Sequence, residues 1–566
     1  MVQAVVMGDI GWPHLYHVGD EAMTETAVDQ LRKRGVDRIT LVAADPATAT
    51  RLHSVPAVPR FHFKLRWPRD WQDSHLEKVL APLVDYERGS SEAVTVHDAV
   101  HDADFVVIAG GGNLTSSYVH QMYERLALVR VARHFGRPVF VTSQTLDSAY
   151  RPRDVPIISE IIDGAELFGL RERTSLAVAR SLASRPGSTR AVGDDGLLTP
   201  MTVAPRSVAE ALPDRYFVAS FERPTWVADD AVDTYYGVVA RALDAAADRL
   251  DCTVLLVPHA GSFDPERPKD DIESHRAIAS RAERVRALPL MRASEVLAVM
   301  APALCSVSTR YHPLVFGAQL EMPVIGLART AYTWHRMRGA ARQVGAEHHV
   351  LPTDVLDDPA TFAAVLAETV TSGDLVRVVR PASRTRREHQ GRWWDEIVAH
   401  ARAAVGDGTD AALAAPEPDI DDPESVALPP AARGLDALIG ATATARAEAE
   451  EHAESLRLEV RRGEELRVET ERELQRRRDR AVTAERGLAV ALHERAESDA
   501  RADAAEAASS QAQGTLRDLD RLLQQTRAER DVWRSAARSF RSEVQRYRDR
   551  RTTRLVDAVG RLFRSR

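Results

Sequence analysis

The residue types best suited to chemistry lie in the segment 306–318, where an expected strand leads into an expected helix. Arg310 carries a permanent positive charge that can bind a phosphate or a carboxylate through two hydrogen bonds. Two residues later, His312 offers an imidazole that can exchange a proton near neutral pH. The pair suggests anion binding beside proton transfer, although a histidine that only caps a helix is the commoner outcome of this spacing.

A second candidate segment, Gly19, Asp20 and Glu21, opens an expected helix shortly after the first expected strand. Asp20 is a good helix N-cap, and Gly19 allows another group to approach the backbone closely. The free N–H groups of a first helical turn favour an anion or a polar substrate. The same three residues are also consistent with a helix cap that has no further role.

A third candidate segment follows the apolar run 105–109 and consists of Gly110, Gly111, Gly112 and Asn113. Consecutive glycines expose backbone N–H groups, and ligands of open parallel sheets bind at the carboxyl ends of the strands. The pattern differs from the glycine fingerprint of dinucleotide-binding folds. A tight turn between strand and helix is an equally good explanation of this segment alone.

The elements that must position these residues follow an alternating order. Over the first 400 residues, short β-branched runs alternate with helical stretches rich in Ala, Leu and Arg, which predicts parallel strands joined by helices and an α/β fold. A turn-rich stretch near 200–214 divides this region into two domains, 1–205 and 206–405. The expected strands are 3–7, 38–42, 105–109, 139–142, 167–170, 216–220, 253–257, 303–307 and 324–326.

The composition of the 566 residues is that of a soluble globular chain, with 44% hydrophobic and 28% charged residues. The two cysteines, Cys252 and Cys305, belong to no Cys-x-x-Cys pair, which excludes a disulfide framework and fits a reducing compartment. The N-terminus reads as a strand and no apolar run is long enough to cross a membrane, so we expect a cytoplasmic protein. No group of carboxylates and histidines has metal-ligand spacing, so metal independence is expected.

The C-terminal part of the chain differs in kind. Residues 406–438 are rich in Pro, Ala and Asp and predict a flexible linker. Residues 439–551 contain no proline, and their later part repeats apolar residues every three or four positions, which predicts a coiled coil and a homo-oligomer. A solvated single helix remains the alternative. Residues 552–566 form a basic amphipathic end that suits either an anionic membrane surface or the last turn of the coiled coil. Nucleic-acid binding is not expected, because the arginines alternate with acidic residues.

Taken together, the motifs of the first 350 residues resemble the polysaccharide pyruvyl transferase family. No single motif is specific, but their order makes coincidence improbable. The matching segments are Gly19-Asp20-Glu21, Gly110-Gly111-Gly112, Arg171-Glu172-Arg173-Thr174-Ser175, Arg310-Tyr311-His312-Pro313-Leu314-Val315-Phe316-Gly317 and Pro323-Val324-Ile325.

The resemblance implies two Rossmann-like domains that face a cleft, similar to the GT-B glycosyltransferases. It also implies transfer of the enolpyruvyl carbons of phosphoenolpyruvate to two hydroxyls of a sugar as a ketal, with no cofactor. Arg310 would then hold the donor's phosphate or carboxylate, and His312 would supply a proton. Arg223 would be a second anion clamp, because a trianionic donor in an acidic chain needs local cations.

Further site residues also follow from the resemblance. The glycine segments and Arg171 would line the substrate site. A lysine that the family often has after the Pro-Val-Ile strand is missing; Arg336 lies near that position, with Arg329 as the alternative. Arginine keeps the charge but not the ability to transfer a proton. His259, which precedes several aspartates, either lines the cleft or belongs to a surface turn.

The acceptor is expected to be a sugar of a cell-surface polysaccharide or glycolipid precursor, which would place the enzyme at the inner face of the membrane. Two other functions remain open at this point. A glycosyltransferase that uses a nucleotide sugar could have the same fold, since fold does not fix chemistry. A transferase-like scaffold that has lost its activity could instead act through the coiled coil.

Overall fold

The structure is a computed structural model, and it divides into two compact units, residues 1–446 and 447–566. The residues that it describes are 2–65, 67–88, 94–147, 150–224, 227, 229–267, 270–404, 422–432, 511, 513–525, 527 and 535. In the second unit, residues 513–525 are helical. Most of the predicted coiled coil and all of the end segment 552–566 lie outside the described residues, so oligomerisation and membrane contact remain predictions.

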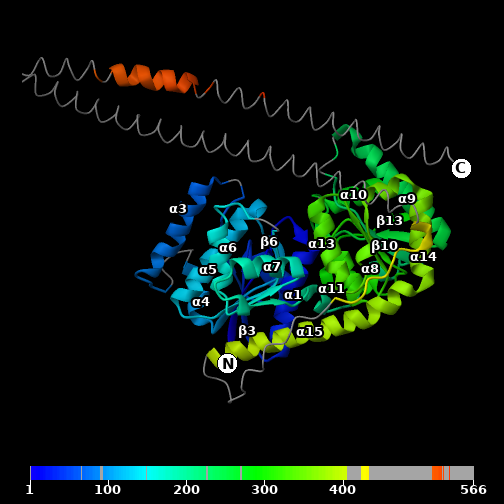
Figure 1. Ribbon diagram of the computed structural model, residues 1–566, viewed down its shortest axis with the longest axis horizontal. Coiled ribbons are helices and arrows are strands. Elements are labelled where there is room, and N and C mark those ends of the chain that lie inside the picture. Colours follow the sequence, from blue (N-terminus) through cyan, green and yellow to red (C-terminus); the bar gives the residue numbers. More distant parts are fainter. Residues whose placement is uncertain are drawn as a thin grey trace, which may run out of the picture. The chain divides into compact units, whose positions relative to one another are not determined.

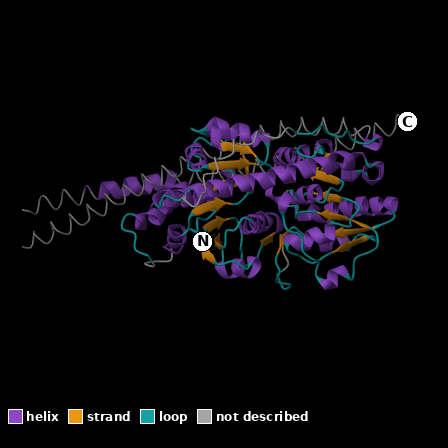
Figure 2. Cartoon of the chain, turned by 90° about the horizontal axis from the view of Figure 1, so that it is seen from below, coloured by secondary structure: helices purple, strands orange, loops and turns teal. Residues whose placement is uncertain are grey.

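The first unit contains two parallel sheets, each with helices on both faces (Figures 1 and 2). The first sheet has the order β4-β3-β1-β5-β7-β8-β9, with β6 paired to β7. Because the strand order reverses between β1 and β5, a crevice forms at their carboxyl ends. Its strands are β1 (Gln3–Met7), β3 (Arg38–Ala43), β4 (Ala57–Pro59), β5 (Phe105–Ile108), β6 (Gly111–Leu114), β7 (Val139–Leu146), β8 (Leu167–Leu170) and β9 (Thr189–Ala191).

The second sheet repeats this topology with six strands in the order β13-β11-β10-β14-β15-β16. Its reversal point lies between β10 and β14, so each domain carries one ligand-binding edge of the same kind. Two Rossmann-like domains are therefore present, as the sequence predicted. The strands are β10 (Tyr216–Ser220), β11 (Thr253–Leu256), β13 (Val285–Ala287), β14 (Ser306–Ser308), β15 (Val324–Ala328) and β16 (Val350–Pro352).

The helices that cover the sheets come mostly from the connections between strands, as expected for parallel strands. They are α1 (Val18–Lys33), α2 (Pro46–His53), α3 (Arg69–Leu80), α4 (Val94–Asp102), α5 (Val119–His134), α6 (Val155–Asp163), α7 (Arg173–Leu182), α8 (Arg206–Ala209), α9 (Val232–Leu250), α10 (Asp271–Ala279), α11 (Ala293–Met300), α12 (His312–Gln319), α13 (Ala331–Arg342), α14 (Pro359–Ser372) and α15 (Asp374–Ala404).

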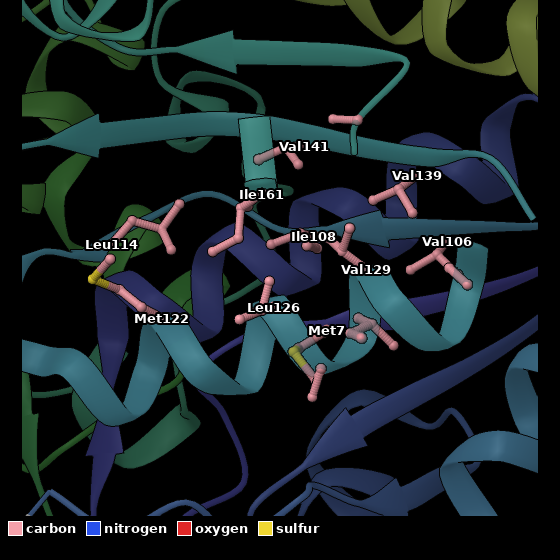
Figure 3. Packing of buried hydrophobic residues seen from close by; sticks show 14 of the residues in the cluster. Met7, Val106, Ile108, Leu114, Met122, Leu126, Val129, Val139, Val141 and Ile161 are labelled. Atoms are coloured by element: carbon pink, nitrogen blue, oxygen red, sulfur yellow. The ribbon is translucent and has the colours of Figure 1, made fainter. Parts of the chain in front are cut away.

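The central strands are continuous apolar runs because both of their faces are covered. All four side chains of β5 are buried; Val106 and Ile108 face α5, while Phe105 and Val107 belong to the core on the other face. Figure 3 shows the α5 side, where Leu126 lies among residues of β5 and β7. Each such side chain stabilises the fold by roughly 1.5–3 kcal/mol.

Helix α15 connects the two domains, which the sequence boundary at 405 did not anticipate. Leu375 lies in a core of the second domain, whereas Trp393 and Trp394 lie in a core of the first. The Trp394 indole donates a 2.8 Å hydrogen bond to buried Asp195. Figure 1 shows this long helix running beneath both domains.

A short cross-domain ladder joins the domains a second time. β2 (Tyr16–His17) of the first domain pairs antiparallel with β12 (Ala260–Gly261) of the second. The Tyr16 hydroxyl accepts a 3.0 Å hydrogen bond from the backbone of Ala293, and Val18 packs into a core of the second domain. The domains therefore share a continuous core at this end of their interface.

The segment 422–432 differs from the flexible linker predicted for 406–438. Asp422 pairs with Arg386 at 2.6 Å, and the backbone N–H of Val426 donates to the carbonyl of Gly345 at 2.9 Å. Ala432 is buried in a core of the second domain. This part of the segment is packed because the second domain offers it both a charged partner and an apolar surface.

Candidate active site

The motifs singled out from the sequence occupy the two ligand-binding edges. Gly110 follows β5, the residues Arg310 to His312 follow β14, and Arg223 follows β10. These strands flank the points where the strand order reverses. The topology therefore brings the predicted segments to the edges at which open parallel sheets bind ligands.

His312 begins α12 in the second domain, and its ring rests on Gly19 of the first. A Cβ atom on Gly19 would lie 1.8 Å from Nδ1 of His312, so any larger residue would displace the ring. Nε2 of His312 is buried and has no hydrogen-bond partner among the residues that the structure describes. The predicted Gly19 and His312 are thus brought together across the domain interface.

Two arginines from different domains lie over the ring of Tyr311. The guanidinium carbon of Arg171 is 5.2 Å from the ring centroid, and that of Arg336 is 5.0 Å from it. Arg171 is fully buried and forms an ion pair with Asp194, at 2.8 Å between Nε and Oδ2. Arg336 lies against Gly112, where a Cβ atom would come within 2.5 Å of Nη2.

These arginines determine the charge state of the histidine. Burial lowers the pKa of His312 well below its usual range, and the positive charges of Arg171 and Arg336 lower it further. The imidazole is therefore neutral at physiological pH when no ligand is bound. An anion placed beside it would offset the arginine charges and raise its pKa.

Asp20 faces the same charges from the first domain. Its carboxylate lies 3.4 Å from Nδ1 of His17. Burial raises the pKa of Asp20, and the charges of His17, Arg171 and Arg336 act in the opposite direction. The site therefore holds a neutral imidazole, a carboxylate and two guanidinium groups, a set that can bind an anion and move protons.

Arg310, in contrast, already has a carboxylate partner. Its Nη2 lies 2.5 Å from Oδ1 of buried Asp271, and Nη1 lies 3.5 Å from Glu222. Asp271 also accepts hydrogen bonds from the backbone N–H groups of His259 and Ala260, each at 3.0 Å. The Arg310 charge lowers the pKa of Asp271 despite burial, so both partners stay ionised.

Glu21 and the first glycine of the Gly110 segment have roles inside the first domain. Glu21 is buried, accepts a 3.0 Å hydrogen bond from the backbone of Gly11 and pairs with His53 at 2.6 Å. A Cβ on Gly110 would overlap Met23 and Ser143. These residues stabilise the edge around the site.

The rest of the Gly110 segment forms β6. Gly111 is paired with Gln144 of β7, and a Cβ there would come within 3.0 Å of the Asn113 side chain. The side-chain oxygen of Asn113 is buried and has no hydrogen-bond partner among the described residues. Asn113 is thus a polar group that a ligand at this edge could engage.

Two other predicted residues lie away from the His312 ring or are closed off by protein contacts. The side chain of Arg223 is 59% exposed and pairs with Glu273 at 3.5 Å. His259 is buried, its Nδ1 lies 3.0 Å from the carbonyl of Val257, and burial lowers its pKa to about 4. His259 is therefore neutral, and it belongs to the Arg310–Asp271 group.

Sequence reasoning missed Asp194 and the part played by Tyr311. Asp194 follows β9, a three-residue edge strand that gave no clear apolar signal. Tyr311 stands between Arg310 and His312, so its position was known but its contact with two arginines was not. That contact joins residues 171, 311 and 336, which no local pattern connects.

A cavity of about 300 Å³ lies between the domains beside this group. Among the predicted residues, it includes Arg171 in its wall, whereas Arg310 and His312 do not line it. Its lining residues are Arg171, Glu172, Arg173, Thr174, Ala191, Gly193, Trp334, His335, Arg338, Gly339, Arg342, Gln343, Glu347, Arg386 and Asp422.

Comparison with solved structures returns sugar-nucleotide enzymes at low similarity. A complex of MnaA with UDP from S. aureus is 11% identical, with a TM-score of 0.48, over 75% of this chain and 100% of that one. UDP-GlcNAc 2-epimerase from Neisseria meningitidis bound to UDP-GlcNAc is 10% identical, with a TM-score of 0.43, over 69% and 99%. The spinosyn rhamnosyltransferase SpnG is 11% identical, with a TM-score of 0.40, over 70% and 99%. The curated proteins include no match.

The fold and the site define an α/β protein of two Rossmann-like domains with a basic, histidine-containing group between them. The family model for polysaccharide pyruvyl transferase matches residues 17–330, more than half of the chain. The chain belongs to this enzyme family, as the resemblance predicted. Among the described residues, no helix is both long and apolar enough to cross a bilayer, and no three potential metal ligands cluster.

Proposed function

We propose that this enzyme transfers the enolpyruvyl carbons of phosphoenolpyruvate to two hydroxyls of a sugar in a cell-surface glycan precursor. The observation that carries the proposal is the neutral, buried His312 beside Arg171 and Arg336 in a chain of the pyruvyl transferase family. Phosphoenolpyruvate has a phosphate and a carboxylate. Two guanidinium groups match these two anionic ends.

The donor's anion clamp in this proposal is the pair Arg171 and Arg336, and Arg310 is a positioning residue. Arg310 is bound by Asp271 and approached by Glu222. Arg171 is also paired, with Asp194, but Arg171 and Arg336 lie over Tyr311 beside His312. Through its pair with Asp271, Arg310 holds the turn between β14 and α12, from which His312 projects. Arg223, whose side chain faces solvent, has no part in the clamp.

The reaction balances without a cofactor. His312 donates a proton to the methylene carbon of the donor, and the first sugar hydroxyl adds to the neighbouring carbon and loses its proton to Asp20. The bond between that carbon and the phosphate oxygen then breaks. The second hydroxyl forms the second C–O bond, and its proton leaves with inorganic phosphate.

Donor binding provides the proton that this mechanism requires. The unliganded imidazole is neutral because it is buried near two positive charges. A bound trianion reverses the local charge, so its binding is coupled to proton uptake by His312. His312 then acts as a general acid near neutral pH.

The donor is admitted where the two domains meet. The His312 ring contacts Gly19 of the other domain on its Nδ1 side, and its Nε2 is buried as well. In this proposal the domains separate for a ligand to reach the ring. Because Gly19 has no side chain, the His312 ring can pack directly against the backbone at this position. Closure of the same contact over the bound donor would exclude water from the reacting carbon.

The test is phosphate release from phosphoenolpyruvate with a glycan acceptor, compared between the natural enzyme and His312→Gln. We expect the variant to lose phosphate release while keeping its thermal stability. Unchanged turnover would contradict the role of His312. Stabilisation by nucleoside diphosphates, with none by phosphoenolpyruvate, would instead favour a nucleotide-sugar glycosyltransferase, and stabilisation by neither would favour a scaffold.

A further inference from the structure

The interdomain cavity is a second basic site, adjacent to the group around His312. Five arginines line it together with three carboxylates: Arg171, Arg173, Arg338, Arg342 and Arg386 against Glu172, Glu347 and Asp422. Its volume of about 300 Å³ falls within the range of small-molecule sites. Both domains, α15 and the segment 422–432 contribute to its wall.

Each carboxylate of the outer wall is shared by two arginines. Glu347 pairs with Arg338 and Arg342, both at 2.6 Å. Asp422 pairs with Arg386 at 2.6 Å and approaches Arg173 at 3.6 Å. Arg342 and Arg338 lower the pKa of Glu347 to about 2, so that it stays ionised.

The inner wall includes Arg171, whose side chain has 0% exposure and forms an ion pair with Asp194 at 2.8 Å. Arg171 also lies over Tyr311, so the cavity and the His312 group share this residue.

We propose that this cavity binds the phosphate or diphosphate group of the glycan acceptor. The inference rests on the proposed function, because a sugar activated for polymerisation carries a phosphate ester at its anomeric carbon. Forked guanidinium groups are the side chains best suited to such esters. With the ester in the cavity, the sugar ring lies beyond Arg171, toward the donor at His312.

The test uses inorganic diphosphate as the probe and measures its binding to the full chain by titration calorimetry. Glu347→Gln and Arg342→Gln break the same ion pair but change the cavity charge in opposite directions. We expect Glu347→Gln to tighten diphosphate binding roughly threefold and Arg342→Gln to weaken it roughly tenfold. Arg206→Gln, in an exposed pair with Glu210, is the matched control and should change nothing.

Equal weakening by both cavity variants, or no change in either, would overturn the proposal. It would also fail if Arg336→Gln, rather than Arg342→Gln, abolished diphosphate binding, because the probe would then occupy the donor site. Inorganic phosphate serves as a second probe. Binding as tight as that of diphosphate would identify the cavity as a site for the released product and overturn the assignment to the acceptor.

The same titrations separate this inference from the proposed function. If phosphoenolpyruvate fails to bind while the affinity for diphosphate changes with the cavity charge as expected, the donor assignment fails and the anion site stands. If phosphoenolpyruvate binds normally while neither cavity variant changes the affinity for diphosphate, the anion site fails and the donor assignment stands. Neither result depends on an identified acceptor.

Discussion

Two arginine groups meet at the segment Arg310 to His312 and differ in their origin: one lies within the second domain, and the other is built from both domains. Arg310 is held by buried Asp271, with Glu222 nearby, so the group is compensated by the protein itself. Around His312, Arg171 and Arg336 approach from different domains, and Arg171 is itself paired with Asp194. Burial lowers the pKa of the histidine, and the two arginine charges lower it further. The difference teaches that closeness in sequence does not identify the arginines beside the histidine. Arg310, two residues before His312, pairs with Asp271, whereas Arg171 and Arg336 reach Tyr311 from distant segments.

The largest expected effects come from removing one arginine of each group. Arg310→Gln leaves Asp271 as a buried charge without its partner, which should lower the free energy of unfolding by about 3 kcal/mol. Arg336→Gln should cost less stability than Arg310→Gln, because Arg336 is only partly buried, and should weaken phosphoenolpyruvate binding roughly 100-fold. Urea denaturation and titration calorimetry measure the two quantities.

The comparison between the groups is wrong if Arg310→Gln affects donor binding and Arg336→Gln affects stability. A stable Arg310→Gln protein that no longer binds the donor would make Arg310 the clamp, as its place in the motif first suggested. Arg206→Gln, which removes an exposed arginine, is the control for a general loss of positive charge.

The next largest effect tests the contact between His312 and the first domain. Gly19→Ala places a Cβ atom 1.8 Å from Nδ1 of His312 and must displace the ring or separate the domains. We expect kcat to fall at least about tenfold, since misplaced catalytic groups lose most of their advantage. Gly391→Ala, at a helical glycine with no atom within 4 Å of the added Cβ, should keep full activity. Equal kcat values for the two variants would contradict the role of Gly19 in positioning His312.

The smallest effect concerns the compensated group. Burial lowers the pKa of His275 to about 4; Asp271 raises it and Arg310 lowers it further. Below its ordinary pKa, the unfolded chain binds a proton that the folded chain refuses, so stability falls as pH drops from about 6.5 to 4. His275→Gln should reduce this loss by roughly 1 kcal/mol between pH 6.5 and 5. Urea denaturation at both pH values tests this, and an unchanged slope would contradict it.

Much of the fold was predictable because local patterns of apolar residues indicate the buried strands. The buried central strands, such as β1 and β5, are continuous apolar runs and appeared where the sequence placed them. The strand predicted at 303–307 lies at Ser306–Ser308, although Leu304 and Cys305 before it already form backbone hydrogen bonds with β10. Short edge strands such as β4 and β13, with few buried residues, left no comparable signal.

The site was predictable only in its parts. His312, Gly19 and Arg171 were singled out individually, but their contacts depend on the docking of two domains, which no local pattern encodes. The pairing of Arg310 with Asp271 was missed because 39 residues separate them in sequence. The sequence left His259 and the aspartates after it as either cleft-lining or surface-turn residues, and it gave no indication of a partner for Arg310.

The most direct test of the account is whether His312 takes up a proton from solvent when the donor binds. Phosphoenolpyruvate is titrated into the full chain at pH 7.5 in buffers of different ionisation enthalpy. The account predicts uptake of about one proton per donor bound, which His312→Gln abolishes while donor binding persists. Donor binding without proton uptake, or uptake that survives in the variant, would contradict it.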